Sequence, residues 1–203
     1  MKRPIIPEGV AYTFADYFRL NVDVDDVLAY FAYTFQAKNC VLPRTTLPLE
    51  RLADLKARLD EALPHISLTS EAARREFLIA PVLFEVIHYT HAKIRVEFPL
   101  EVTEQLRGTL DYYLQAKTNL LIIEAKNADL QRGFTQLAVE LIALDKWLES
   151  DPAWLYGAVS MGNIWQFGLL DRQAKHVIQD LNLYRVPADL NDVLSILVAV
   201  LTE

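Results

Sequence analysis

The chain has 203 residues, of which 52% are hydrophobic, so it is long enough to bury a full core as one compact unit. Its formal net charge of -7 excludes a protein coated on all sides with positive charge, so any contact with nucleic acid needs a local basic patch. A single cysteine, Cys40, excludes an internal disulfide and a cysteine-based zinc site, which leads us to expect a reducing, cytoplasmic compartment.

The first part of the chain has the pattern of helices. From about Phe14 to Leu63, apolar residues recur at intervals of three and four, and a stripe of leucines within residues 49–63 predicts one of these helices. Residues 1–68 are therefore expected to form a helical N-terminal layer that packs on the core of the protein.

A further helix is predicted from Thr69 or Ser70 to about His88. Either residue can cap its start, because a hydroxyl oxygen accepts a hydrogen bond from a backbone N–H of the first turn. Pro81 lies inside this helix and is expected to kink or divide it, since proline lacks the N–H that an α-helix uses.

The pattern then changes to that of strands. Residues 93–98 alternate strictly between polar and apolar, which is the period of a half-buried strand. Residues 106–114 and 119–126 are predicted to form two more strands. The run from Leu120 to Ile123 is apolar enough to be buried on both faces of a sheet.

The rest of the chain contains two helices and a hairpin. A helix is predicted at about 133–149, and strands at 154–160 and 164–170 are joined by a short turn. The last helix, at about 190–201, holds the longest apolar run, far shorter than the roughly 20 residues that cross a bilayer, so no membrane contact is expected. This order predicts an α/β or α+β core with a helical N-terminal layer, in which residues 69–203 form the main domain.

Charged residues at the end of the apolar strand point to chemistry. Alternation along the strand places Glu124 and Lys126 on the same face. Asp111 lies in the preceding predicted strand, and pairing of the two strands would let its carboxylate converge with that of Glu124. Two carboxylates with open positions beside them are the ligands that Mg²⁺ prefers.

Such a cluster predicts hydrolysis of a phosphodiester, with Mg²⁺ as cofactor and Mn²⁺ as a substitute. The ion would hold a bridging phosphate and activate water. Lys126 would orient that water or help to deprotonate it, and would offset the charge of the transition state. A plainer interpretation is an exposed ion pair between Glu124 and Lys126, worth less than about 1 kcal/mol. The spacing alone is a weak signal, because Asp54 and Lys56 share it in a predicted helix.

Gly108-x-x-Asp111, a short loop, the apolar run and Glu124-Ala125-Lys126 together resemble the core of the PD-(D/E)XK, or restriction-endonuclease-like, nucleases. The resemblance implies an α/β fold with a restriction-endonuclease-like mixed sheet flanked by helices. It also implies a divalent metal held by Asp111 and Glu124, and Lys126 at the attacking water. Leu110 stands where the family's name-giving motif has proline. The helix after the last strand of the motif often carries a glutamine that approaches the site, and Gln136 matches it in position.

Two further acidic residues have open interpretations. Residues 70–83 resemble the opening helix of the nuclease domain of type I restriction subunits, which implies that Glu71 completes the metal ligands. Glu71 also suits the dipole at a helix start without any functional role. Glu140 lies one turn after Gln136, and either a solvated helix edge or a functional role explains it.

The resemblance implies that the substrate is DNA. Five basic residues lie near the proposed site in the sequence, but acidic residues are interleaved with them, so an ordinary mixed surface explains them equally well. These residues are Lys93, Arg95, Arg107, Lys117 and Arg132. Two rival functions stay open: a non-catalytic scaffold that keeps the fold and works as a homodimer through its helical layer, and a recombination accessory protein that binds branched DNA.

Overall fold

The computed structural model describes residues 5–6, 9–116, 119–126, 128–149 and 152–202. Lys117, one of the basic residues considered above, lies outside the described residues. No helix within these ranges is long and apolar enough to cross a membrane.

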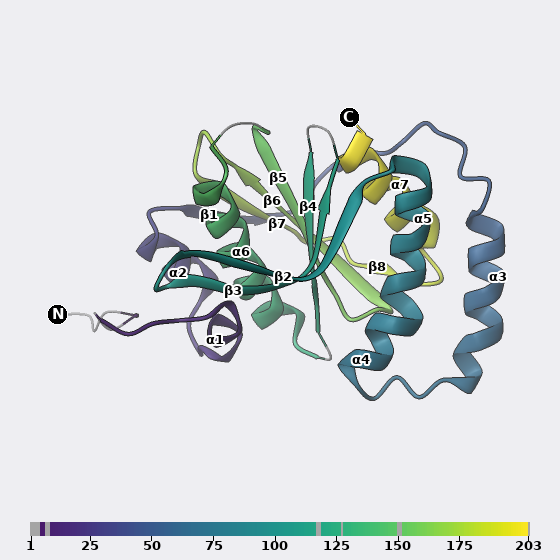
Figure 1. The fold of residues 1–203 in the computed structure, drawn as a ribbon, viewed down its shortest axis with the longest axis horizontal. Coiled ribbons are helices and arrows are strands. Elements are labelled where there is room, and N and C mark those ends of the chain that lie inside the picture. Colours follow the sequence, from purple (N-terminus) through teal and green to yellow (C-terminus); the bar gives the residue numbers. More distant parts are fainter. Residues whose placement is uncertain (1–4, 7–8, 117–118, 127, 150–151, 203) are drawn as a thin grey trace.

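One mixed sheet of eight strands runs through the molecule (Figure 1). Its order is β1-β7-β6-β5-β4-β3-β2, and β8 pairs with β6. The pairs β1/β7 and β4/β5 are parallel and the others are antiparallel. The strands are β1 (Thr34–Lys38), β2 (Lys93–Thr103), β3 (Leu106–Gln115), β4 (Leu120–Ala125), β5 (Trp154–Ser160), β6 (Ile164–Asp171), β7 (His176–Asp180) and β8 (Tyr184–Arg185).

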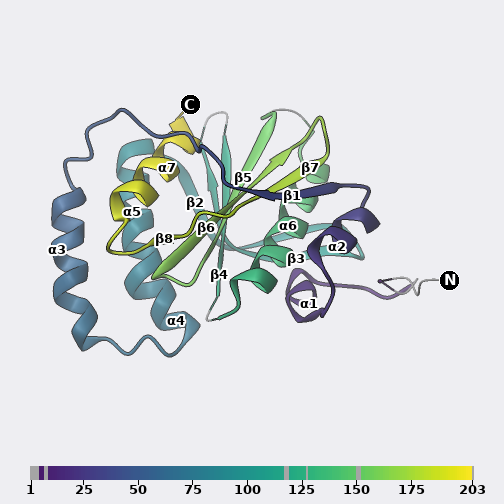
Figure 2. The same ribbon diagram turned by 180° about the vertical axis from the view of Figure 1, so that it is seen from behind.

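Helices cover both faces of this sheet (Figures 1 and 2). One face carries α1 (Phe14–Arg19), α2 (Val24–Tyr30) and α6 (Leu130–Trp147); the other carries α5 (Ala80–Thr90) and α7 (Leu190–Thr202), with α3 (Leu52–Ala62) outside them. The short helices are the 3-10 helix η1 (Leu63–His65), α4 (Glu71–Arg74) and the π-helical turn η2 (Arg75–Ile79). An α/β protein with a mixed sheet flanked by helices is therefore confirmed.

The expectation of a purely helical first segment is wrong at Thr34–Lys38. These residues form the edge strand β1, which pairs in parallel with β7. The ring of Phe35 packs 6.2 Å from that of Phe134 of α6. Helical spacing on both sides hides so short a strand, and its pairing partner lies about 140 residues away in the sequence. The strands β7 and β8 were not predicted either.

The helix predicted from Ser70 begins and divides as expected. The Ser70 hydroxyl accepts a hydrogen bond from the Ala73 N–H at 3.1 Å, which caps α4. The division takes the form of the π-helical turn η2, which ends directly before α5, and Pro81 lies in the first turn of α5. The missing N–H of proline makes this the point at which regular α-helical bonding is hardest to sustain.

The strands β3 and β4 pair antiparallel, with Tyr112 opposite Ile123. Ile122 packs on the α6 side of the sheet, while Leu121 and Ile123 pack on the side of α5 and α7. Burial of this run on both faces is confirmed, as is the β5/β6 hairpin. The carboxyl end of β4 lies against the first turns of α6, and the polar residues of the predicted site meet there.

Candidate active site

Glu124 is a buried carboxylate at the end of β4, with its side chain 2% exposed. The Lys126 ammonium donates a hydrogen bond to its Oε1, and Gln136 Nε2 donates to the same oxygen at 2.6 Å. The Lys126 side chain is only 13% exposed. The interpretation of Glu124 and Lys126 as an exposed ion pair is therefore wrong.

Gln136 joins Glu124 to a second buried carboxylate on α6. Its Nε2 donates to Glu140 Oε1 at 2.8 Å, and Glu140 is completely buried. A solvated helix edge is thus wrong for Glu140. Because Gln136 and Glu140 are one turn apart, both face the end of β4 from the same side of α6.

Asp111 of β3 lies beside the same strand end. The Ala125 N–H donates a hydrogen bond to Asp111 Oδ2 at 2.8 Å, and the Arg75 guanidinium lies 3.7 Å from Asp111 Oδ1. The Asp111 side chain thus extends the contact of β3 with β4 past the Tyr112/Ile123 pair. The structure brings Asp111, Glu124, Lys126 and Gln136 to one end of the sheet.

The crowding of carboxylates changes their protonation. Burial, followed by the charge of Asp111, raises the pKa of Glu124 to about 7, and the Lys126 ammonium partly opposes this. Burial and the charge of Glu124 raise the pKa of Glu140 well above its ordinary value. Both pKa values are therefore raised chiefly by burial, which favours a protonated carboxyl group in this pair.

Lys126 remains an ammonium in this setting. Burial would lower its pKa, but the charge of Glu124 and the hydrogen bond to it outweigh burial and raise that pKa. A protonated lysine can donate to a water molecule or offset negative charge, but it cannot accept a proton. Its Nζ also lies 5.1 Å from the ring centroid of Phe18 in α1.

An open pocket of about 540 Å³ adjoins Lys126 and Gln136. Glu71, in the first turn of α4, lines the same pocket and is partly buried. The other lining residues are Ala15, Phe18, Arg19, Ala128, Asp129 and Arg132. Sequence reasoning missed the contribution of α1, because α1 precedes the motif by about a hundred residues and only the adjacent aromatic and basic side chains hint at binding.

Of the described basic residues considered for DNA, Arg132 lines this pocket and the others lie elsewhere. The Arg95 guanidinium lies 5.0 Å from the ring centroid of Phe98 on β2. Lys93 is exposed at the start of β2, and Arg107 lines a separate pocket along β2 and β3. Among the basic residues that the structure describes, the site therefore has a small cationic rim and no broad basic surface.

Oxygen donors gather here without forming a ready-made metal centre. Within the described residues, no three His, Cys, Asp or Glu side chains form a group that could hold a metal ion as they stand. Glu124 Oε2 and Glu140 Oε2 are nevertheless buried without a hydrogen-bond partner. Buried carboxylate oxygens without partners, next to a further carboxylate, suit a hard cation, so the residues present fit a divalent metal.

The fold and the cluster define an α/β protein with a buried carboxylate, lysine and glutamine site at the end of a central strand. Comparison with known proteins gave no matching family model, no matching curated protein and no matching solved structure.

Proposed function

We propose that this protein is a divalent-metal-dependent nuclease with a restriction-endonuclease-like fold, which hydrolyses phosphodiester bonds of DNA. One observation carries the proposal: Lys126 and Gln136 both donate to a buried Glu124 whose pKa is raised by burial and by Asp111. Perturbed carboxylates beside a lysine in a pocket are typical of catalytic sites rather than of structural ion pairs. The choice of DNA comes from the resemblance of the motif.

The residues of the chain have separate roles in this proposal. Gln136 holds the Glu124 side chain in one orientation through a hydrogen bond, and the Gln136 amide is itself oriented by donating to Glu140. The Lys126 ammonium donates to the attacking water and offsets the negative charge that grows on the phosphate. In the reaction, the water oxygen forms a bond to phosphorus and the ester P–O bond breaks. The proton released by the attacking water passes to solvent, and the leaving oxygen takes up a proton from solvent.

The metal-binding part of the proposal uses the acidic residues. Asp111 and Glu124 would hold a Mg²⁺ or Mn²⁺ ion, with Glu71 on the pocket wall as a third ligand. When bound, the ion supplies positive charge that draws in the phosphate and polarises water. Binding would also relieve the repulsion between buried carboxylates, since a cation near Glu124 favours its ionised form.

Cleavage assays with Lys126→Met test the catalytic role. This substitution keeps much of the side-chain length and removes the charge, so we expect at least about a hundredfold slower DNA cleavage in Mg²⁺, with the far-ultraviolet circular dichroism unchanged. The matched control is Lys93→Met, an exposed lysine away from the pocket, which should cleave at the wild-type rate. Equal cleavage by Lys126→Met and wild type would contradict the proposal.

Titration calorimetry with Mg²⁺ and Mn²⁺ tests the metal site. Asp111→Asn retains an oxygen that accepts from the Ala125 N–H but removes the charge, so we expect metal binding to weaken at least tenfold while the fold is kept. Absence of binding to the wild type, or binding untouched by Asp111→Asn, would favour the non-catalytic scaffold. Binding of branched DNA with no cleavage of linear, nicked or branched forms would favour the recombination accessory protein.

A further inference from the structure

The pocket beside Lys126 is walled on one side by α1. Ala15, Phe18 and Arg19 come from this helix, opposite Glu71 of α4 and Gln136 of α6. Its volume of about 540 Å³ lies within the roughly 300–1,000 Å³ of pockets that enclose a single small ligand. A space of this size suits one nucleotide unit rather than two paired strands.

The helix α1 is a fixed wall. Phe14 and Tyr17 are fully buried, and the Tyr17 hydroxyl donates to the Gln105 carbonyl oxygen at 2.7 Å. Gly108 of β3 has a φ of +149°, and a side chain there would meet the ring of Phe14 at 2.8 Å. The backbone of β3 therefore approaches α1 as closely as glycine allows, and a duplex could enter only by displacing buried core residues.

The lining of the pocket suits one unpaired nucleotide. Phe18 is partly buried and turns a ring toward the Lys126 ammonium. Arg19 and Arg132 lie on the same rim, each in an ion pair with a partly exposed aspartate, and such pairs are weak. An aromatic face combined with cations is how proteins hold single strands, because the base stacks on the ring while the cations contact phosphate.

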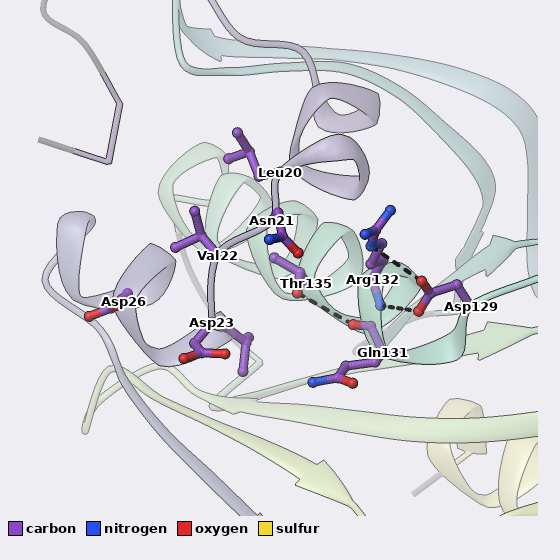
Figure 3. Close-up of a pocket in the computed structure, with 10 residues that line it drawn as sticks. Leu20, Asn21, Val22, Asp23, Asp26, Asp129, Gln131, Arg132 and Thr135 are labelled. Carbon is purple, nitrogen blue, oxygen red and sulfur yellow. Dashed lines mark hydrogen bonds and ion pairs between the residues drawn. The ribbon is translucent and has the colours of Figure 1, made fainter.

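A second cleft adjoins this pocket across Arg132 and Asp129 (Figure 3). It has a volume of about 520 Å³ and is lined by the segment between α1 and α2 and by the first turns of α6. Asp23, Asp26 and Asp129 line it, against Arg132 as the one cation among its lining residues. Asp129 lines both pockets and is paired with Arg132, whereas Asp23 and Asp26 line only this cleft. These two carboxylates repel a phosphodiester backbone, which disfavours continuation of a strand seated at Phe18 through this cleft.

We propose that the substrate of this site is the free end of a single strand, whose terminal nucleotide occupies the pocket with its base on Phe18. The adjoining phosphate contacts Arg19, Arg132 and Lys126, and the rest of the strand leaves toward solvent, away from the acidic cleft. This inference rests on the proposed function, because it names the substrate of the same phosphodiester-hydrolysing site.

Binding without divalent metal tests the inference separately from cleavage. The probes are an eight-nucleotide deoxythymidine strand labelled in its middle and a blunt duplex hairpin, both followed by fluorescence anisotropy in EDTA. We expect the single strand to bind at least tenfold more tightly than the hairpin. Phe18→Ala should weaken single-strand binding roughly 5- to 150-fold, because stacking of one base contributes on that scale.

Two controls separate stacking from folding. Phe18→Tyr keeps an aromatic face and should bind within about twofold of the wild type. Phe84→Ala removes an aromatic side chain that is 68% exposed on α5, and it should leave binding unchanged. Equal affinity for strand and hairpin, or equal affinity of Phe18→Ala and wild type, would overturn the inference.

Cleavage in Mg²⁺ then tests the requirement for an end. A linear single strand should be degraded and a covalently closed single-stranded circle should be spared; cleavage of the circle at the linear rate would overturn that requirement. Phe18-dependent strand binding without any cleavage would support the inference on binding and contradict the proposed function. Cleavage that is the same on duplex and strand and independent of Phe18 would support the proposed function and overturn the inference.

Discussion

At the scale of single residues, Glu124 and Glu140 lower the stability of the fold because both carboxyl groups lie in the same buried space. Neither carboxyl reaches solvent, and each keeps one oxygen without a hydrogen-bond partner. Buried polar groups of this kind lower the stability of the fold, and a function is one reason for retaining them. Gln136 and Lys126 offset part of the cost by donating to them.

This pair predicts a stability that falls as pH rises. The pKa of Glu124 is about 7 in the folded protein, against an ordinary value of 4.5, so the folded state keeps a proton that the unfolded state loses between these pH values. Unfolding free energy should therefore decline from about pH 4.5 to 7. Glu124→Gln removes the charge and keeps the shape, and should be more stable than wild type at pH 8 by about 1–3 kcal/mol.

Urea denaturation at pH 5, 6, 7 and 8 measures this effect. Because the pKa of Glu140 is also raised, Glu124→Gln should reduce the slope of stability against pH without abolishing it. The matched control is Glu61→Gln, an exposed carboxylate on α3, whose profile should follow that of the wild type. An unchanged slope in Glu124→Gln would contradict the assignment of the raised pKa to this pair.

At the scale of elements, the position of α6 on the sheet determines the geometry of the site. Gly133 lies in its first turns, and a side chain there would meet a Val159 methyl of β5 at 2.8 Å and the Lys126 side chain at 3.1 Å. The close approach of α6 to β4 and β5 is what lets Gln136 and Glu140 reach Glu124. A glycine in a helix therefore marks a packing requirement here and not a weak point of the helix.

Gly133→Ala should destabilise the protein. At an open helical position this change stabilises by about 1 kcal/mol, but overpacking against a buried β-branched side chain costs about 1–3 kcal/mol. Val159→Ala removes the methyls that clash with the new side chain. It should therefore lower the free energy of unfolding less in the Gly133→Ala protein than in the wild type, with a difference of at least about 0.5 kcal/mol. Urea denaturation of the four proteins measures this coupling, and strictly additive effects would contradict the packing argument.

At the scale of the whole molecule, α3 lies outside α5 and α7 (Figure 1) and packs Leu55 and Leu59 into the same apolar core. Charge adds a second link between α3 and α5. The Glu85 side chain of α5 is 2% exposed, while its partners Arg51 and Arg58 are 45% and 54% exposed. Arg58 donates to Glu85 Oε1 at 3.3 Å, and Arg51 Nε lies 3.1 Å from Oε2 without hydrogen-bond geometry. The buried member of this network is the carboxylate.

This asymmetry predicts unequal effects of removing the two sides. The double variant Arg51→Ala/Arg58→Ala leaves the buried Glu85 carboxylate without these two cations. Its free energy of unfolding should fall by roughly 3 kcal/mol or more. Glu85→Gln leaves two half-exposed guanidinium groups that water can solvate, and should cost about 1 kcal/mol. Denaturation measures both, and hydrogen exchange should show faster exchange across α3 in the double variant.

Lys56→Ala, which removes an exposed ion pair with Asp60 on α3, is the control and should change stability by less than about 0.5 kcal/mol. If Glu85→Gln lowered the free energy of unfolding as much as the double arginine variant, the predicted asymmetry of this charge network would be contradicted.

Local patterns in the sequence were enough to predict most of the sheet and helices. The strict alternation at 93–98, the apolar run of β4 and the leucine spacing of α6 each reflect burial of one face or of both, which neighbouring residues encode. The same alternation placed Glu124 and Lys126 on one face, because side-chain direction in a strand has a period of two.

Only the tertiary structure decided the remaining features. Pairing of β1 with β7, burial of Glu140 beneath Glu124, the contact of Asp111 with the Ala125 N–H and the wall that α1 forms beside Lys126 all join segments that lie apart in the chain. The sequence by itself determined which residues could alternate or repeat along one element. Which elements meet depends on the packing of the whole core, and no local period records it.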